Sequence, residues 1–516
     1  MQGVKARSGV ASIQPVDVKG GTCYTGIGKA ANWRETGSPN PILEILVCEQ
    51  RKDWRESVRV ALAYPYCKTT SHHCAPPLGL LYLGTALKQR GDEVAVFDRD
   101  AHDGGMQEMI NRIVEFKPDL FGIPIFTVSL GLTEALAITN EVRSKLPNTT
   151  IVAGGPHVTA CPEETLDWFP AVDFVLQGEA DDKLCQLVEQ LESNASQPQV
   201  PGLCYRSDGQ NVVTSPGPPP PNLDSIPIPD RKLLWYGYEK KVYWRLGRRG
   251  IADIVITSRG CPFNCKFCFK VEKRFRYRSP DNVVNELLYL NSLGIRSIDL
   301  EDDLWTVPKS RCLEICRLIR NAGLRLDLKV RSRVDTIDEE MLAEMRRIGV
   351  TSIVYGFESG SQPVLDAMGK KTQVQRNYEV VRMTKKAGML CFADMFIGFP
   401  GETPETLAET ERFLVTARPT AINMCYLAPF PGTPVYLEAK KNGTLVGDWA
   451  IGSPPPYVKL DWMTDWSSLA KFYKRIMRRY YTHPLVLLGT LRSCAFKIGP
   501  RQWRSGFRLL MRTARR

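Results

Sequence analysis

Short apolar runs alternate with helical patterns along most of this 516-residue chain, and this alternation limits the folds available to it. Six such runs follow residue 250, separated by amphipathic stretches such as PDNVVNELLYLNSLG and EEMLAEMRRIGV: IADIVITS, SIDLED, LRLDLKVRS, SIVYGFES, LCFADMFIGF and INMCYLAPF. Repeated strand–helix units of this kind form parallel sheets. The simplest such fold for six repeats is a partial (β/α)6 barrel.

A second block of five α/β repeats precedes the barrel repeats. Its strand-like runs are RVALAYP, EVAVFD, LFGIPIF, TIVAGGP and FVLQGE, with helical patterns such as GLLYLGTALKQRG between them. This pattern predicts an open doubly wound, flavodoxin-like sheet, which binds ligands at the carboxyl edge of its strands. The loop after the first strand, CKTTSHHCAPPLGL, lacks the GxGxxG of dinucleotide-binding domains, so a nicotinamide cofactor is not expected.

The two blocks divide the chain into five segments. They are an unassigned segment at 1–56, the doubly wound domain at 57–195, a linker at 196–232, the partial barrel at 233–440, and a basic helical region at 441–516. The linker contains SPGPPPPNLDSIPIPDRKLL, in which clustered prolines favour a semi-rigid extended conformation.

Three cysteines, Cys261, Cys265 and Cys268, lie in the loop after the first barrel strand. Their CxxxCxxC spacing supplies three of the four ligands that a cubane iron–sulfur cluster needs, so one iron stays open to bind and reduce another molecule. A structural zinc site usually adds a second Cys pair or His residues, and none follows here. A simple electron carrier would have a fourth cysteine nearby.

With Phe267 directly before the last cysteine, this loop resembles the radical S-adenosylmethionine (SAM) signature. The resemblance implies that the amino and carboxylate groups of SAM chelate the fourth iron of a 4Fe–4S cluster. It also implies an external low-potential electron donor of the flavodoxin or ferredoxin type, and a 5'-deoxyadenosyl radical that abstracts hydrogen from unactivated C–H bonds.

The first block, with PPLGLLYLGTAL, GGPHVT and VLQGEADD, resembles the cobalamin (B12)-binding domain that precedes the radical SAM barrel in one large subfamily. The run IPIPDR is similar to the connector between these two domains. The resemblance extends from about residue 57 to residue 440, in the expected order. Methyltransferases and enzymes of the anaerobic magnesium-protoporphyrin cyclase type belong to this subfamily.

Special residues follow each barrel strand in turn, at the edge where such folds place their chemistry. The resemblance implies SAM contacts at Phe267, Glu301, Asp302, Arg333, Glu358, Gly398, Pro400 and Gly401. It implies cobalamin contacts at Thr127, Ser129, Gly154, Gly155, Pro156, His157, Gly178 and Glu179. No catalytic residue is assigned beyond the cluster ligands.

Several of these positions have a purely structural alternative. Glu301 to Asp303 would equally suit the N-terminal cap of the following helix, because carboxylates favour that end of a helix dipole. Gly154 and Gly155 suit a turn that ends a strand. Asp335 is expected to cap the helix of DEEMLAEMRRIG and not to act as a base.

Asp100, His102 and Gly105 form a DxHxxG string, which in some cobalamin proteins supplies a histidine to cobalt. In those proteins the string follows the first strand of the domain, whereas here it follows the second. We therefore interpret it as a chance match in a polar turn. His72 and His73 lie nearer the expected ligand edge but belong to no motif.

Positive charge is concentrated at the C-terminus. Lys471 to Arg516 contains thirteen Lys or Arg residues and no Asp or Glu, so the rest of the chain is nearly neutral. Mixed with Trp503, Phe507, Leu509 and Leu510, this charge predicts an amphipathic helix that could contact the periphery of an anionic membrane or bind an acidic substrate. The alternative is a solvated helix end packed by its apolar face, and nucleic acid is not expected as a partner.

No 18-residue apolar stretch appears, and the first 21 residues lack the apolar core of a signal peptide, which together predict a cytoplasmic protein. Most of the fifteen cysteines are scattered, and an oxygen-sensitive cluster needs a reducing compartment.

The resulting hypothesis is a cobalamin-dependent radical SAM methyltransferase. It would transfer a methyl group from methylcobalamin to an unactivated carbon, or phosphorus, of a secondary metabolite or lipid precursor. A non-methylating oxidative cyclase or ring-rearrangement enzyme is the main alternative. An RNA methylthiotransferase fits less well, because Cys67 and Cys74 do not complete a second set of three cluster cysteines.

Overall fold

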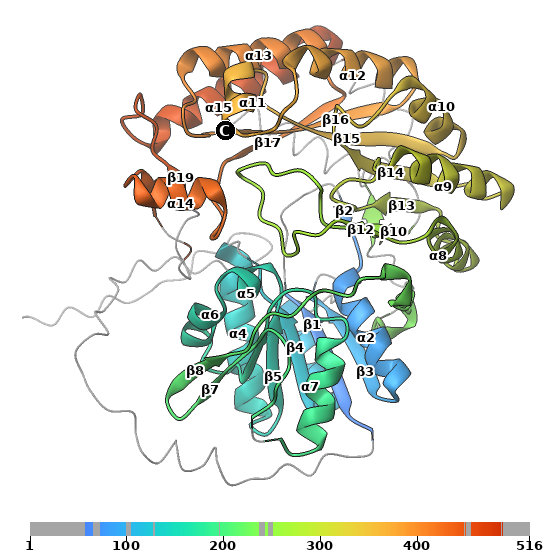
Figure 1. The fold of residues 1–516 in the computed structure, drawn as a ribbon, viewed down its shortest axis with the longest axis vertical. Helices are drawn as coiled ribbons and strands as arrows, with labels where there is room; N and C mark the ends of the chain where they lie inside the picture. The colour runs from blue at the N-terminus through green and yellow to red at the C-terminus, as the bar shows by residue number, and fades with distance from the viewer. Residues whose placement is uncertain are drawn as a thin grey trace, which may run out of the picture. The chain divides into compact units, whose positions relative to one another are not determined.

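The computed structural model describes residues 57–65, 73–99, 105–126, 129–195, 197–236, 243–245, 251–447, 449, 456–486 and 488, with the backbone alone at 73–74, 129–130 and 244–245. These residues belong to one compact unit that contains two large sheets (Figure 1). The expectations for residues 1–56, His72, Asp100, His102, Thr127 and the tail beyond 488 lie outside the described residues, and those for the side chains of His73 and Ser129 do too.

The first sheet has seven strands in the order β3-β1-β4-β5-β6-β7-β8, and the first five of these are parallel. The bounds are β1 (Arg59–Tyr64), β3 (Glu93–Asp98), β4 (Leu120–Pro124), β5 (Thr150–Gly154), β6 (Phe174–Leu176), β7 (Leu203–Ser207) and β8 (Gln210–Val213). Because β3 lies at the edge beside β1, the parallel strands follow the flavodoxin-like order, which confirms the predicted fold.

Helices cover both faces of this sheet. One face packs against α2 (Leu78–Arg90) and α7 (Lys183–Glu192). The other packs against α3 (Gly105–Phe116), α4 (Ser129–Lys145), α5 (Pro156–Ala160) and α6 (Pro162–Trp168). In β1, Val60 and Leu62 point to the first face and Ala61 and Ala63 to the second. Burial on both sides explains why the strands are almost continuously apolar.

The hairpin of β7 and β8 corrects the predicted linker. These strands lie within 196–232 but extend the first sheet in antiparallel pairing with β6. Asp208 and Gly209, at the turn, have φ values of 50° and 73°, as a two-residue type I′ turn requires. The connection between the domains therefore begins after Val213.

The second sheet has six parallel strands in chain order, with β10 and β17 at its edges. Its strands are β10 (Ala252–Val255), β13 (Ser297–Leu300), β14 (Asp327–Ser332), β15 (Val350–Glu358), β16 (Leu390–Ile397) and β17 (Ala421–Tyr426). The helices are α8 (Pro280–Ser292), α9 (Lys309–Asn321), α10 (Glu339–Arg347), α11 (Gln362–Ala367), α12 (Val374–Lys386) and α13 (Pro404–Ala417). They follow the outer side of the sheet in Figure 1, so the predicted partial barrel is confirmed.

Charged side chains occupy the inner face of this barrel. Arg331 pairs with Glu301 at 2.8 Å and with Asp394 at 3.5 Å, which connects three neighbouring positions across the sheet. Lys329 lies 3.6 Å from Glu301, and Asn423 Nδ2 donates to Asp394 Oδ1 at 3.1 Å. Because strand side chains alternate between faces, the apolar residues between these positions pack outward against the helices.

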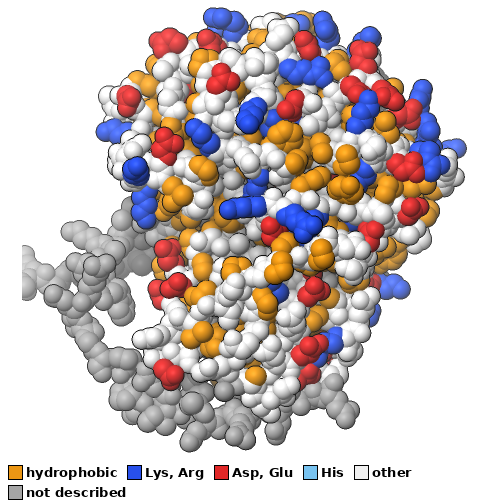
Figure 2. All heavy atoms as spheres, in the orientation of Figure 1, with side chains coloured by type: hydrophobic (Ala, Val, Ile, Leu, Met, Phe, Trp, Pro, Cys, Tyr) orange, Lys and Arg blue, Asp and Glu red, His pale blue; other side chains and the backbone are white. Residues whose placement is uncertain are grey.

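The C-terminal region adds α14 (Pro434–Lys441), a short hairpin of β18 (Leu445–Val446) and β19 (Tyr457–Val458), and α15 (Trp466–Tyr481). Arg475 and Arg479 of α15 pair with Glu411 of α13 at 2.9 and 3.1 Å, so part of the basic excess is neutralised within the fold. On the face shown in Figure 2, basic and acidic side chains are interspersed. Among the described helices, none has the length and apolar character needed to cross a bilayer.

Candidate active site

A cavity of about 600 Å³ lies at the carboxyl edge of the first sheet and reaches the cysteine loop of the barrel. One wall comes from β1, β4, β5 and the loop after β6, together with the start of α2. The opposite wall comes from the two flanks of the cysteine loop and the end of β13. Both predicted cofactor regions therefore face one shared space.

Glycines form part of the first wall. Gly155 has a φ of 99°, and a Cβ added there would lie 3.0 Å from the carbonyl oxygen of Ile125. Gly178 has a φ of 74° and lies where the chain leaves β6. Where glycines stand in this wall, a large flat ligand can approach the backbone closely, which fits a corrinoid. Five of the predicted cobalamin contacts line the cavity: Gly154, Gly155, Pro156, Gly178 and Glu179.

His157 is placed differently from the prediction. Its side chain is fully buried and stacks on Trp168, with 5.6 Å between ring centroids. Neither ring nitrogen has a hydrogen-bond partner among the described residues, and burial lowers the pKa of the imidazole to about 4. The His157 side chain does not line the cavity, where contact with cobalamin was expected, and packs in the core of the domain instead.

The cysteine loop is held between β11 (Ser258–Arg259) and β12 (Arg276–Tyr277), which pair antiparallel. A Cβ on Gly260 would lie 2.8 Å from the carbonyl oxygen of Arg274, so the two sides of the loop approach too closely for another residue. Lys270 Nζ donates to the carbonyl oxygens of Cys261, at 2.8 Å, and of Phe263. The backbone of the loop is thereby fixed around the predicted cluster ligands.

The three thiols of the loop are the predicted cluster ligands. Within the described residues, no three His, Cys, Asp or Glu side chains converge on a point that one metal ion could occupy. Lys370 and Arg333 place positive charge near Cys265, which stabilises a ligating thiolate there.

Arg333 lies against the cluster loop. Its Nη1 is 3.6 Å from Cys265 Sγ, and its guanidinium carbon is 3.7 Å from the centre of the Phe263 ring. Asp335 holds the same guanidinium through two hydrogen bonds of 2.9 Å. Asp335 is therefore not a helix cap as expected; Asp338 caps α10 by accepting from Met341 N at 2.9 Å.

The acidic stretch after β13 divides into three roles. Glu301 pairs with Arg331 and lines the cavity. Asp302 is fully buried and accepts from Thr257 N at 2.6 Å and Ser258 Oγ at 2.7 Å, so it fixes the chain before the cysteine loop and has no contact with the cavity.

Asp303 is the carboxylate of this stretch that the sequence analysis left out of the SAM set. Its side chain is exposed and lines the cavity. Desolvation raises its pKa, with Arg331 and Lys270 acting in the opposite direction. The alternative of a helix cap is wrong for the whole stretch, because α9 begins only at Lys309, after Pro308.

The remaining expected SAM residues lie on the barrel side, outside the cavity lining. Glu358 has a φ of 64° and pairs with the buried Lys370 at 2.7 Å. Phe267 packs edge-on against Phe396, with ring centroids 4.6 Å apart. Gly398, at the start of the GFPGET turn, has a φ of 96°.

Glu402, in the same turn, was missed by the sequence analysis. One carboxylate oxygen accepts from Gly398 N at 2.6 Å, while the other is buried and has no hydrogen-bond partner in the part of the chain that the structure describes. Burial raises its pKa to about 7. The sequence GFPGET offered a signal for this residue, because its glutamate lies four residues after the first glycine and can accept a hydrogen bond from the backbone of the same turn.

Comparisons with known proteins agree with this geometry. A model of the B12-binding domain matches residues 67–188, and a model of the radical SAM superfamily matches residues 255–414. An uncharacterized methyltransferase of Pyrococcus horikoshii is 32% identical over 419 residues, which cover 80% of this chain and 89% of that protein. The anaerobic magnesium-protoporphyrin IX monomethyl ester cyclase of Cereibacter sphaeroides is 31% identical over 71% of this chain and 60% of its own.

A solved structure shares the fold. The radical SAM methyltransferase TsrM from Kitasatospora setae, with cobalamin and a 4Fe–4S cluster bound, matches with a TM-score of 0.71 at 19% identity, over 89% of this chain and 99% of that one. Together with the Pyrococcus relative and the two domain models, this shows that the chain belongs to the radical SAM enzymes with an N-terminal B12-binding domain, whose cofactors are a 4Fe–4S cluster, SAM and cobalamin.

Proposed function

We propose that this enzyme transfers a methyl group to an unactivated carbon, or to phosphorus, of a small secondary metabolite or lipid precursor. The observation that carries the proposal is the single cavity lined by both the cobalamin edge of the first sheet and the cysteine loop. A methyl donor and a hydrogen-abstracting centre must reach the same substrate, and one shared space allows this.

The bound cofactors would supply a transferable methyl group, from cobalamin, and hydrogen abstraction, from SAM and the cluster. The chain's own residues would hold and orient them. Cys261, Cys265 and Cys268 would ligate the cluster, and Arg333 and Lys370 place positive charge beside it. Gly154, Gly155 and Gly178 would admit the corrinoid, and exposed Asp303 offers a hydrogen-bond acceptor to SAM or substrate.

Anaerobic reconstitution with iron, sulfide, hydroxocobalamin, SAM and a low-potential reductant tests the proposal. Methyl transfer consumes SAM in two ways, so S-adenosylhomocysteine should appear beside 5'-deoxyadenosine when extracts of candidate metabolites are added. An external flavodoxin or ferredoxin should replace the chemical reductant. Persistent absence of S-adenosylhomocysteine across substrate pools would refute methyl transfer.

Oxidative ring closure is the second candidate, because one relative with 31% identity is a magnesium-protoporphyrin ester cyclase. Such chemistry would give 5'-deoxyadenosine without S-adenosylhomocysteine. Incubation with magnesium-protoporphyrin monomethyl ester distinguishes the two directly.

A further inference from the structure

Carboxylates after β6 pair with the strand that leads into the cysteine loop. Arg259 Nη1 lies 2.6 Å from Asp181 Oδ2 and 2.9 Å from Glu179 Oε2, and its Nη2 donates to Asp181 Oδ1 at 3.0 Å. A guanidinium with two bonds to one carboxylate is fixed in direction as well as distance. Arg259 thus connects the B12-binding domain to the barrel two residues before Cys261.

The partners of Arg259 are themselves restrained. Arg276, opposite Arg259 in the β11–β12 pair, also forms an ion pair with Glu179 and donates to the carbonyl oxygen of Pro220 at 2.6 Å. The Arg259 guanidinium carbon lies 5.1 Å from the centre of the Tyr82 ring in α2. Two arginines of the barrel therefore bind one acidic loop of the other domain.

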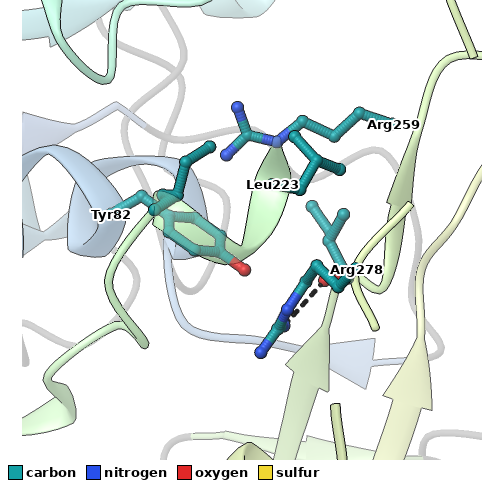
Figure 3. Close-up of a pocket in the computed structure, with 6 residues that line it drawn as sticks. Tyr82, Leu223, Arg259 and Arg278 are labelled. Atoms are coloured by element: carbon teal, nitrogen blue, oxygen red, sulfur yellow. Dashed lines mark hydrogen bonds between the residues drawn. The ribbon is translucent and has the colours of Figure 1, made fainter. Parts of the chain in front are cut away.

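Figure 3 shows this junction, with the Arg259 guanidinium above the Tyr82 ring and the Tyr82 hydroxyl directed toward Arg278. Leu223 of the linker fills the space beside them. The void left among these side chains is about 10 Å³, which holds at most one water molecule. The junction is therefore closely packed, and its ion pairs are partly shielded from solvent.

The linker fixes the same two domains at a second point. Asp230 pairs with Lys88 of α2 at 2.8 Å. The next residue, Arg231, is fully buried in the barrel and binds Glu286 at 2.6 Å and Asp253 at 3.3 Å. Adjacent residues of the linker thus contact opposite domains, Asp230 through Lys88 and Arg231 through Glu286 and Asp253.

We propose that Arg259 is a positioning residue that holds the corrinoid wall of the cavity in a fixed relation to the cluster loop. Gly178 and Asp181 line the cavity from one side, and Ser258 and Gly260 line it from the other, so the ion pair joins the walls directly. Without it, Arg276 and the linker would still connect the domains, but the two-point bond that fixes the direction of the contact between these walls would be lost. This inference rests on the cofactors of the family and does not depend on which bond the enzyme makes.

Arg259→Met tests the proposal, because it removes the charge and all donors while keeping most of the side-chain length. Arg90→Met is the matched control. Arg90 has a side-chain exposure of 19%, against 17% for Arg259, and it also binds two carboxylates, Asp92 at 2.5 Å and Glu192 at 2.6 Å, but entirely within the B12-binding domain. Asp181→Asn weakens the bridge from the other domain, and Arg259→Lys keeps the charge without the two-point geometry.

The measurements on the full-length, anaerobically reconstituted protein are hydroxocobalamin affinity by visible absorption, iron and sulfide content, and hydrogen–deuterium exchange of residues 176–181 and 258–278. We expect Arg259→Met to bind hydroxocobalamin about tenfold more weakly. Exchange should rise in both segments, while iron and sulfide content stay at the wild-type level. Asp181→Asn should reproduce the loss, and Arg259→Lys should fall between.

Unchanged affinity and exchange in both Arg259→Met and Asp181→Asn would overturn the proposal. An equal loss of affinity in Arg90→Met would also overturn it, because the effect would then report general destabilisation. Since none of these measurements requires methyl transfer, a failure of the proposed reaction would leave their result intact.

Discussion

The two sheets of this protein solve the problem of ligand binding in different ways. The first sheet is apolar on both faces, so a ligand can only reach the carboxyl edge of its strands, where glycines replace side chains. The barrel sheet is apolar outside and charged inside, so its inner face also offers polar groups to a ligand. The first domain can therefore hold a cofactor by shape, whereas the barrel can also select a ligand by charge.

The largest expected effect breaks the barrel side alone. Cys265→Ala should abolish reductive SAM cleavage, because two thiolates cannot hold the cluster in its three-cysteine site. Hydroxocobalamin binding should persist. Cys185→Ala, in α7 of the other domain, is the control and should retain 5'-deoxyadenosine formation. Undiminished 5'-deoxyadenosine in Cys265→Ala, measured by chromatography, would contradict the cluster assignment.

The complementary change breaks the first domain alone. Gly155→Ala should weaken corrinoid binding by about tenfold or more, because the added Cβ meets the backbone of Ile125 at 3.0 Å beside the cavity. Gly91→Ala is the matched control: it has a similar φ of 107° but open space around the added atom. Corrinoid affinity is measured by absorption titration. Equal affinities in the two variants would mean that Gly155 is not part of the cobalamin site.

A smaller effect concerns pH and the turn at Glu402. Because burial raises its pKa to about 7, the folded state binds a proton that the unfolded state has released, so stability should fall as pH rises from about 5 to 7. Glu402→Gln should flatten this slope and raise stability at pH 8 by about 1–3 kcal/mol.

Urea unfolding of the cluster-free protein at several pH values measures this slope. Glu405→Gln, at an exposed position of the same segment, is the control and should keep the wild-type slope. A slope that survives in Glu402→Gln would mean that another group titrates.

The smallest expected effect is on the cluster potential. Arg333→Gln removes a positive charge and a donor 3.6 Å from Cys265 Sγ, so the potential should become more negative. Lys309→Gln, a distant and exposed change, should leave it unchanged. The cluster potential is measured by a redox titration followed by electron paramagnetic resonance. Equal potentials in the two variants would show that Arg333 has only a structural role.

The sequence predicted the order of elements well, because the strands of both sheets are marked by short apolar runs that can be recognised locally. Alternating apolar runs located the five parallel strands of the first sheet and the six of the second. The hairpin of β7 and β8 was missed although its Asp208–Gly209 turn is a standard signal, because the neighbouring proline cluster dominated the interpretation.

Site residues were harder to predict where several similar ones are adjacent. Glu301, Asp302 and Asp303 differ little in sequence, and only the path of the chain decides that Asp302 turns inward while Asp303 stays in the cavity. His157 was misplaced for a related reason, since a motif does not say which side of a one-turn helix faces the ligand. The Arg259–Asp181 pair joins residues 78 positions apart, which no local pattern reveals.

The adjacency of Asp230 and Arg231 has a consequence for how such chains can change in length. Loops generally tolerate inserted residues. One extra residue between Asp230 and Arg231 would instead prevent the contacts with Lys88 and with Glu286 from forming together. The direct adjacency of Asp230 and Arg231 therefore restricts insertions at this point of the chain.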